Sequence, residues 1–186
     1  MRVTVYDKNP GVGLAQWFLK TSWFLGCFIQ KLLGQVDAYY GATSWLDAIE
    51  WLTRQPKPLM SIQYWGHGSP GRVWLAQKTV AAAGFLPLKS RVAKASVIWF
   101  RTCSTFQGQE GYDFSANLSN LLDCTVAGHT RIVGLLQGGL HTRAPHTDPS
   151  WPITDGEFPP SHMASNGLKS GNNTVTCFAT EIPHGW

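Results

Sequence analysis

Residues 59–68, LMSIQYWGHG, and residues 96–103, SVIWFRTC, decide the fold of this chain. Each is a short, largely apolar run followed by turn-forming residues, a pattern typical of strands that are buried on both faces of a parallel sheet. His67 comes just after the first run and Cys103 just after the second. Because the carboxyl ends of parallel strands meet at one edge of an open sheet, we expect these two side chains to lie close together.

Strands and helices alternate over the first two thirds of the chain. Apolar alternation and turn residues predict further strands at 2–6, 36–40 and 125–127. Helical periodicity predicts helices at 12–33, 44–52 and 112–122. We therefore expect an α/β fold with an open, mostly parallel sheet and helices on both faces. The helix at 12–33 is expected to be buried and not to be a membrane segment, because Lys20 lies near its middle.

Length and composition fit one globular domain. The chain has 186 residues, of which 44% are hydrophobic and only 14% are charged. The expected core covers residues 1–135, and the loop-rich part at 136–186 ends in a strand at 174–182. A surface with so few charges leaves room for a partner protein.

The charges and cysteines exclude several classes of partner. The net charge is only +4, and no basic run is interleaved with aromatic residues, so nucleic acid is not expected as a partner. The four cysteines lie far apart without a CxxC motif, which favours free thiols in a reducing compartment, the cytoplasm. We expect neither binding to a membrane nor a cofactor.

A histidine and a cysteine at neighbouring strand ends have the chemistry of a nucleophilic pair. A thiolate is the reactive form of cysteine, and a nearby histidine can take up the thiol proton. Gly68 follows His67 and lacks a Cβ, so its backbone N–H can approach a substrate carbonyl closely. The N–H of Cys103 is a second donor for the oxyanion that forms during attack.

These residues resemble the caspase-like cysteine peptidases of clan CD, and most closely a bacterial branch of them. That branch has a strand ending in His-Gly and a later strand ending in Cys, followed by glycines, a phenylalanine and a helix. Here the matching stretches are SIQYWGHGSPGRVWL and SVIWFRTCSTFQGQEGYDFSANLSNLLDCTVAG, with Gly108, Gly111 and Phe114 at the corresponding offsets. The resemblance covers about residues 59–128.

The resemblance implies a thiol protease that cleaves protein or peptide substrates without a cofactor. His67 would be the general acid and base, Cys103 the nucleophile, and Gly68 with Cys103 the oxyanion hole. A peptide would bind as an extended strand beside the sheet edge. Candidate substrate-binding residues are Arg101, His129 and Arg131.

Two other functions stay open at this point. The same scaffold could be a non-catalytic protein-interaction module, in which Cys103 is an ordinary small residue. On paper, a zinc site could also be assembled from His129, His141, His146, His162 and Cys177. Their spacing does not match a known zinc motif, so no metal is expected.

Overall fold

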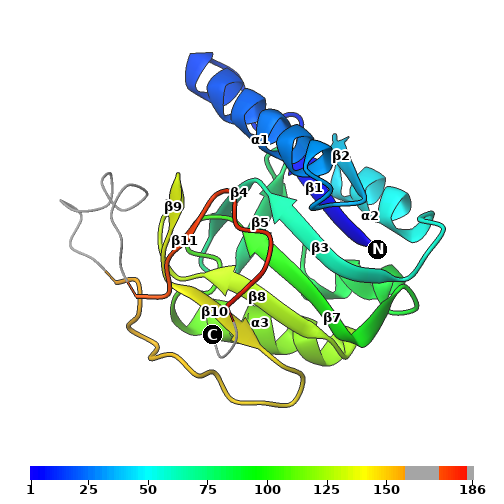
Figure 1. The fold of residues 1–186 in the computed structure, drawn as a ribbon. Coiled ribbons are helices and arrows are strands. Elements are labelled where there is room, and N and C mark those ends of the chain that lie inside the picture. Colours follow the sequence, from blue (N-terminus) through cyan, green and yellow to red (C-terminus); the bar gives the residue numbers. More distant parts are fainter. Residues whose placement is uncertain (158–171, 184–186) are drawn as a thin grey trace.

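A computed structural model of the protein describes residues 1–157 and 172–183. Its described residues form a six-stranded sheet, in which the strands lie in the order β10-β8-β7-β3-β1-β2 (Figure 1). Their bounds in that order are Leu140–Arg143, Thr125–His129, Val92–Arg101, Leu59–Trp65, Arg2–Asp7 and Ala38–Ala42. Five strands pair in parallel, and β10 pairs antiparallel with β8. The predicted α/β architecture with a mostly parallel sheet is confirmed.

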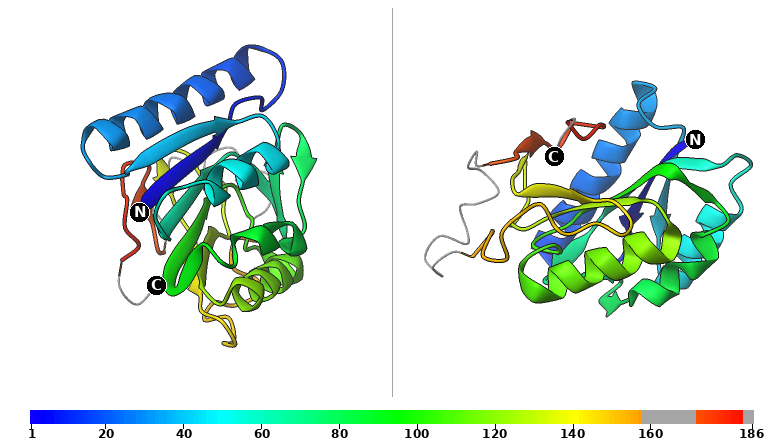
Figure 2. Two further views of the ribbon diagram at one scale, coloured as in Figure 1. Left: turned by 90° about the vertical axis from the view of Figure 1, so that its right-hand side faces the viewer. Right: turned by 90° about the horizontal axis from the view of Figure 1, so that it is seen from below.

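Helices cover both faces of this sheet, also as predicted (Figure 2). Helix α1 (Leu14–Leu32) lies on one face, and α2 (Trp45–Thr53) and α3 (Gly108–Leu122) lie on the other with the 3₁₀ helix η1 (Ala82–Leu88) between them. Helix α2 begins after Ser44, whose hydroxyl oxygen accepts a hydrogen bond from the backbone N–H of Asp47.

The two faces of the sheet have different chemistry, because side chains alternate along each strand. The face toward α2, η1 and α3 forms the main apolar core, which includes Val3, Val5, Ile62, Tyr64, Ile98 and Phe100. The opposite face carries large aromatic and polar side chains, which include Thr4, Gln63, Trp65, Trp99 and Arg101, all buried. This second face is the floor of the site described below.

Helix α1 does not lie in the core, so the prediction of a buried helix is wrong. Of its residues, only Gly26, Cys27 and Gln30 are buried. Gly26 meets the sheet, and a Cβ at this position would lie 2.7 Å from the ring of Trp65. The helix therefore turns its small and polar residues inward, which the sequence period alone does not reveal. None of the helices in the described part of the chain is both long enough and apolar enough to cross a bilayer.

The part after residue 135 is more ordered than the sequence predicts. Besides β10, it contains β9 (Leu136–Gln137), which pairs with β11 (Val175–Thr176). The strand predicted at 174–182 shrinks to those two residues of β11. Within the loop-rich part predicted at 136–186, residues 158–171 and 184–186 lie outside the described residues.

The segment after His67 makes a small sheet of its own. Strands β4 (His67–Ser69), β5 (Arg72–Leu75) and β6 (Lys78–Thr79) pair antiparallel in sequence order. The hairpin of β4 and β5 turns at Gly71, whose φ of +65° favours glycine.

Candidate active site

His67 and Cys103 occupy equivalent positions on two neighbouring parallel strands. In the pairing of β3 with β7, Trp65 lies opposite Arg101. His67 and Cys103 each come two residues later, past the carboxyl end of their strand. The two residues therefore lie at the same edge of the sheet, as the sequence predicts.

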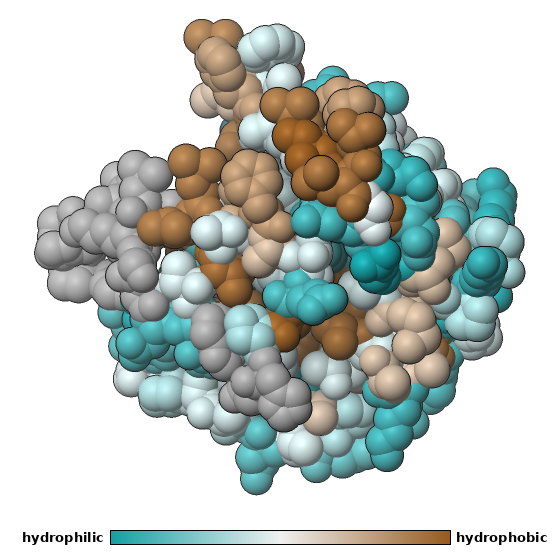
Figure 3. All heavy atoms as spheres, viewed as in Figure 1, coloured by the Kyte–Doolittle hydropathy of each residue, from teal (hydrophilic) through white to brown (hydrophobic). Residues whose placement is uncertain are grey.

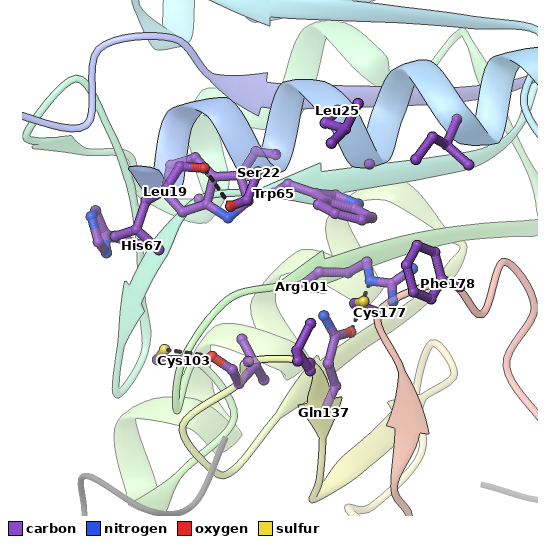
Figure 4. Close-up of a pocket in the computed structure, with 17 residues that line it drawn as sticks. Leu19, Ser22, Leu25, Trp65, His67, Arg101, Cys103, Gln137, Cys177 and Phe178 are labelled. Atoms are coloured by element: carbon purple, nitrogen blue, oxygen red, sulfur yellow. Dashed lines mark hydrogen bonds between the residues drawn. The ribbon is translucent and has the colours of Figure 1, made fainter. Parts of the chain in front are cut away.

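Both residues line one cavity of about 490 Å³ (Figure 4). Its walls come from α1, from the ends of β3 and β7, and from the segments around β9 and β11. The polar lining residues include Ser22, His67, Arg101, Cys103, Gln137 and Cys177. Apolar side chains such as Leu19, Leu25, Leu135 and Phe178 make up much of the remaining wall. A cavity with an apolar wall and a few convergent polar groups is typical of a ligand or substrate site.

The loop after His67 is packed directly onto the loop that holds Cys103. A Cβ at position 68 would lie 2.6 Å from the Cys103 carbonyl oxygen and 2.5 Å from Thr105 Oγ1. Gly71 donates its backbone N–H to the Thr105 carbonyl at 3.0 Å. Glycine is thus required at position 68, and the two loops are fixed relative to each other. The sequence suggested Gly68 for a different reason, as an oxyanion donor.

Cys103 lies in a turn whose backbone is constrained on its carboxyl side. Ser104 has a φ of +52°, in the left-handed region that non-glycine residues rarely adopt, and its N–H donates to the Arg131 carbonyl at 2.9 Å. Strained residues of this kind cluster at functional sites. Within the described part of the chain, the backbone N–H of Cys103 has no hydrogen-bond acceptor. This donor is therefore available to a ligand.

The thiol of Cys103 is in its protonated, unreactive form at neutral pH. Burial raises the pKa of this thiol, and a backbone hydrogen bond from Val133 lowers the pKa only in part. Cys103 is still partly exposed, so a ligand in the cavity can reach it. A base must remove its proton before the sulfur becomes a strong nucleophile.

The His67 ring is held by two residues of α1. Its Nε2 lies 3.0 Å from Gln16 Oε1, and the ring packs edge-on against Trp23 with 5.4 Å between centroids. No hydrogen bond joins this ring to the Cys103 thiol within the described residues. Burial lowers the pKa of His67, so the imidazole is neutral at pH 7 and can accept a proton.

Asp7 supplies negative charge close to His67. It ends β1, is fully buried, and accepts hydrogen bonds from the backbone N–H groups of Asn9 (2.8 Å) and Ala76 (3.1 Å). Burial raises the pKa of this carboxyl, and these two bonds and the nearby His67 lower it. The Asp7 carboxylate in turn partly offsets the effect of burial on the pKa of His67.

Of the three predicted substrate-binding residues, Arg101 is the one that lines the cavity shared by His67 and Cys103. Its guanidinium is buried between the rings of Trp65 and Trp99, at 4.7 and 4.3 Å from their centroids. It donates to the side-chain oxygens of Gln63 (3.0 Å) and Gln137 (2.9 Å) and to the carbonyls of Thr176 and Ala179. Burial lowers its pKa to about 9, which leaves the guanidinium charged at neutral pH.

The other two predicted substrate-binding residues do not line this cavity. His129 is fully buried, accepts the indole N–H of Trp99 at 3.2 Å, and lies 3.1 Å from the Gly138 carbonyl. Arg131 forms an ion pair with Asp155 at 3.2 Å. Both side chains are engaged in holding the chain after β8.

Among the described residues, His129, His141 and His146 do not gather with Cys177 into a metal site. Across the described residues, no group of three or more histidine, cysteine or acidic side chains has the arrangement of metal ligands. His141 instead pairs with Asp155 at 2.7 Å. His162 lies outside the described residues. All four cysteines have free thiols, as expected.

The sequence did not predict the residues that contact His67 from distant parts of the chain. Gln16 and Trp23 come from α1, and Asp7 ends β1. The one available signal for Asp7 was its position, since a polar residue directly after a buried strand lies at the same sheet edge as the pair.

Comparison of the chain with protein-family models, with curated proteins and with solved structures finds no match.

Proposed function

We propose that this protein is a cysteine endopeptidase of the caspase-like type, in which Cys103 and His67 form the catalytic pair. One observation carries the proposal: the two residues follow a matched pair on adjacent parallel strands, and both open into the same cavity. Ordinary buried cysteines and turn histidines have no reason to share such a position. The resemblance of the two motifs to caspase-like peptidases agrees with it.

The proposed reaction proceeds through an acyl-enzyme. His67 takes the thiol proton, and the sulfur of Cys103 attacks the carbonyl carbon of the peptide bond. The oxyanion accepts hydrogen bonds from the N–H groups of Gly68 and Cys103. The C–N bond then breaks, and His67 gives its proton to the leaving amine. Water, with its proton passed to His67, hydrolyses the thioester and releases the acid and the free thiol.

Electrostatics support the assignment of roles. A histidine with a lowered pKa is neutral at pH 7 and is ready to act as a base. The Asp7 carboxylate stabilises the imidazolium that forms when His67 takes the thiol proton. The thiolate is formed only during the reaction, because burial raises the Cys103 pKa.

Gln16 holds the imidazole of His67 away from the Cys103 sulfur. The Nε2 atom of His67 lies 3.0 Å from Gln16 Oε1, and Gln16 lines a neighbouring recess with Asp7 instead of the cavity that His67 shares with Cys103. Substrate binding would have to release this contact, so that the ring turns toward the sulfur. The pair is thus in a resting arrangement that tightens when substrate is bound.

Hydrolysis of a peptide mixture tests the proposal. Purified protein is incubated with a diverse set of peptides and new amino termini are identified by mass spectrometry. We expect cleavages that disappear in both Cys103→Ser and His67→Gln while the fold, followed by circular dichroism, is retained. Cleavage that persists in Cys103→Ser would contradict the proposal.

A non-catalytic interaction module is the second candidate, favoured by the raised pKa of Cys103 and by the Gln16 contact to His67. In that case the cavity binds a peptide without cleaving it. Binding of peptides by wild type and by Cys103→Ser with equal affinity, and no new amino termini, would support this alternative.

A further inference from the structure

The outer face of α1 is more apolar than its inner face, the reverse of an ordinary surface helix. Its inward positions include Gln16, Gly26 and Gln30, whereas large apolar side chains face outward. The outward set, called the α1 ridge below, consists of Leu14, Trp17, Phe18, Phe24, Leu25, Phe28 and Leu32, all at least two fifths exposed. Brown atoms gather over α1 in the space-filling view (Figure 3).

The α1 ridge is a continuous stripe. At 3.6 residues per turn its members fall within an arc of roughly 120°, over the whole length of the helix. Thr21, the polar residue in that arc, donates its hydroxyl to the Trp17 carbonyl within the helix at 2.8 Å. Ordinary soluble domains do not expose contiguous apolar surface on this scale without a partner.

The two charged residues of α1 itself, Lys20 and Lys31, are both positive. Lys20 and Lys31 lie on α1 within about 40° of the edge of the stripe, and the helix holds no acidic residue. Lys31 donates to the Asp37 backbone carbonyl at 2.6 Å. Lys8 joins Lys20 and Trp17 around a recess near the start of the helix. The occupant of the ridge must therefore combine apolar material with negative charge.

We infer that α1 docks in the interfacial region of a lipid bilayer that carries anionic headgroups. A helix with Trp, Phe and Leu on one face and lysines at its edge has the composition of helices that lie in the membrane plane. A second copy of the chain fits less well, because the lysines of α1 would find no acidic residue on the facing α1. A bilayer also receives a protruding ridge without a complementary groove (Figure 1).

Docking would bring the cavity next to the membrane surface. Leu25 belongs to the ridge and lines the cavity, and Leu19 and Ser22 of the same helix line it as well (Figure 4). The inference does not depend on catalysis at Cys103.

Sedimentation with vesicles tests the inference. The full chain is mixed with phosphatidylcholine vesicles that contain about 30% phosphatidylserine, and with vesicles of phosphatidylcholine alone. We expect binding to the anionic vesicles that falls at least about tenfold in Phe18→Ser/Phe28→Ser, which removes apolar contact. A similar fall is expected in Lys20→Glu/Lys31→Glu.

The matched control is Leu46→Ser/Leu86→Ser, which removes two apolar side chains from the opposite side of the sheet that are 70% and 52% exposed, against 59% for Phe18 and 44% for Phe28. It should bind like wild type, and all variants should keep the wild-type melting temperature because the altered side chains are exposed. Absence of vesicle binding by the wild type would overturn the inference. So would binding unaffected by either α1 variant. A concentration-dependent dimer that the Phe18→Ser/Phe28→Ser variant abolishes, without vesicle binding, would assign the ridge to a second copy instead.

Discussion

The α-carbon of Gly68 lies so close to the carbonyl of Cys103 that a Cβ at position 68 would be 2.6 Å from that oxygen. This contact joins the loop after β3 to the loop after β7. A hydrogen bond from the Gly71 N–H to the Thr105 carbonyl joins the same two loops. Together, the contact and the hydrogen bond fix the spacing between the loop that holds His67 and the loop that holds Cys103. The His-Gly motif is therefore a packing requirement of the site as well as a source of an N–H donor.

Gly68→Ala should damage both stability and the site. The added methyl would meet the backbone at Cys103 and the side chains of Thr102 and Thr105, so we expect a loss of about 1–3 kcal/mol in the free energy of unfolding. Urea unfolding measures this loss. Gly138→Ala is the control: its new methyl would meet two side chains, the Thr174 hydroxyl at 3.1 Å and Arg131 Cδ at 3.6 Å, and no backbone atom within 4 Å. Equal stability of Gly68→Ala and wild type would show that the two loops are not locked together.

Gln16→Leu should release His67. The substitution removes the acceptor 3.0 Å from Nε2 but keeps an apolar side chain on α1. If this contact restrains the imidazole, alkylation of Cys103 by iodoacetamide should accelerate roughly two- to tenfold, the range expected for one hydrogen bond. The double variant Gln16→Leu/His67→Ala should lose the acceleration. An unchanged rate in Gln16→Leu would remove any restraining role for this contact.

His129 should make the protein sensitive to acid. Burial lowers its pKa to about 3, although the hydrogen bond to the Gly138 carbonyl acts in the opposite direction, and Arg101 and His141 nearby lower the pKa by smaller amounts. The unfolded chain takes up this proton near pH 6.5, so stability is complete above that pH and falls as the pH drops toward 3. Between pH 6 and 4 we expect a loss of roughly 1.4 kcal/mol per pH unit from this residue.

His129→Gln checks the acid prediction, because glutamine can still accept the Trp99 indole N–H but does not titrate in this range. Urea unfolding at several pH values should give a shallower slope for the variant, by about one proton. Parallel slopes for the two proteins would mean that His129 takes up its proton in the folded state as readily as in the unfolded chain.

Arg101→Met should destabilise the cavity wall. The guanidinium donates to four oxygens, from Gln63, Gln137, Thr176 and Ala179, and no substitute in the variant donates to them. We expect a loss of about 3 kcal/mol or more, with a smaller loss in Arg101→Lys, which keeps a donor. Chemical denaturation of wild type, Arg101→Met and Arg101→Lys measures the three free energies of unfolding and tests this prediction. A change below about 0.5 kcal/mol in Arg101→Met would contradict the packing role assigned to it.

The sheet and the position of His67 and Cys103 at one of its edges could be predicted because they depend on local patterns. The apolar run at 59–65 matches β3 residue for residue, and His67 follows it. Strand β10 could not be predicted in the same way. Its residues, LHTR, are mostly polar, and it forms because it pairs with the edge of β8. Pairing of that kind is set by tertiary structure and leaves little trace in the period of the sequence.

The surroundings of the pair could not be predicted, because they come from distant segments. Gln16 is 51 residues from His67 in the sequence, and the two meet only once α1 lies across the sheet. The exposure of α1 was missed for a related reason: periodicity shows that a helix has an apolar face but not which way that face points. His129 and Arg131 were expected near the pair because β8 ends at the same sheet edge. Their contacts, to Trp99 and Gly138 for His129 and to Asp155 for Arg131, hold both side chains outside the cavity.

The most direct test of the central claim is the labelling of cysteines by a peptidyl electrophile, followed by mass spectrometry. Cys177 is an internal control, since it lines the same cavity and burial raises its pKa as well. We predict rapid, selective modification of Cys103 that slows by about a hundredfold or more in His67→Ala. Slow labelling of Cys103 and Cys177 at similar rates, unchanged in His67→Ala, would contradict the claim that these residues form an activated pair.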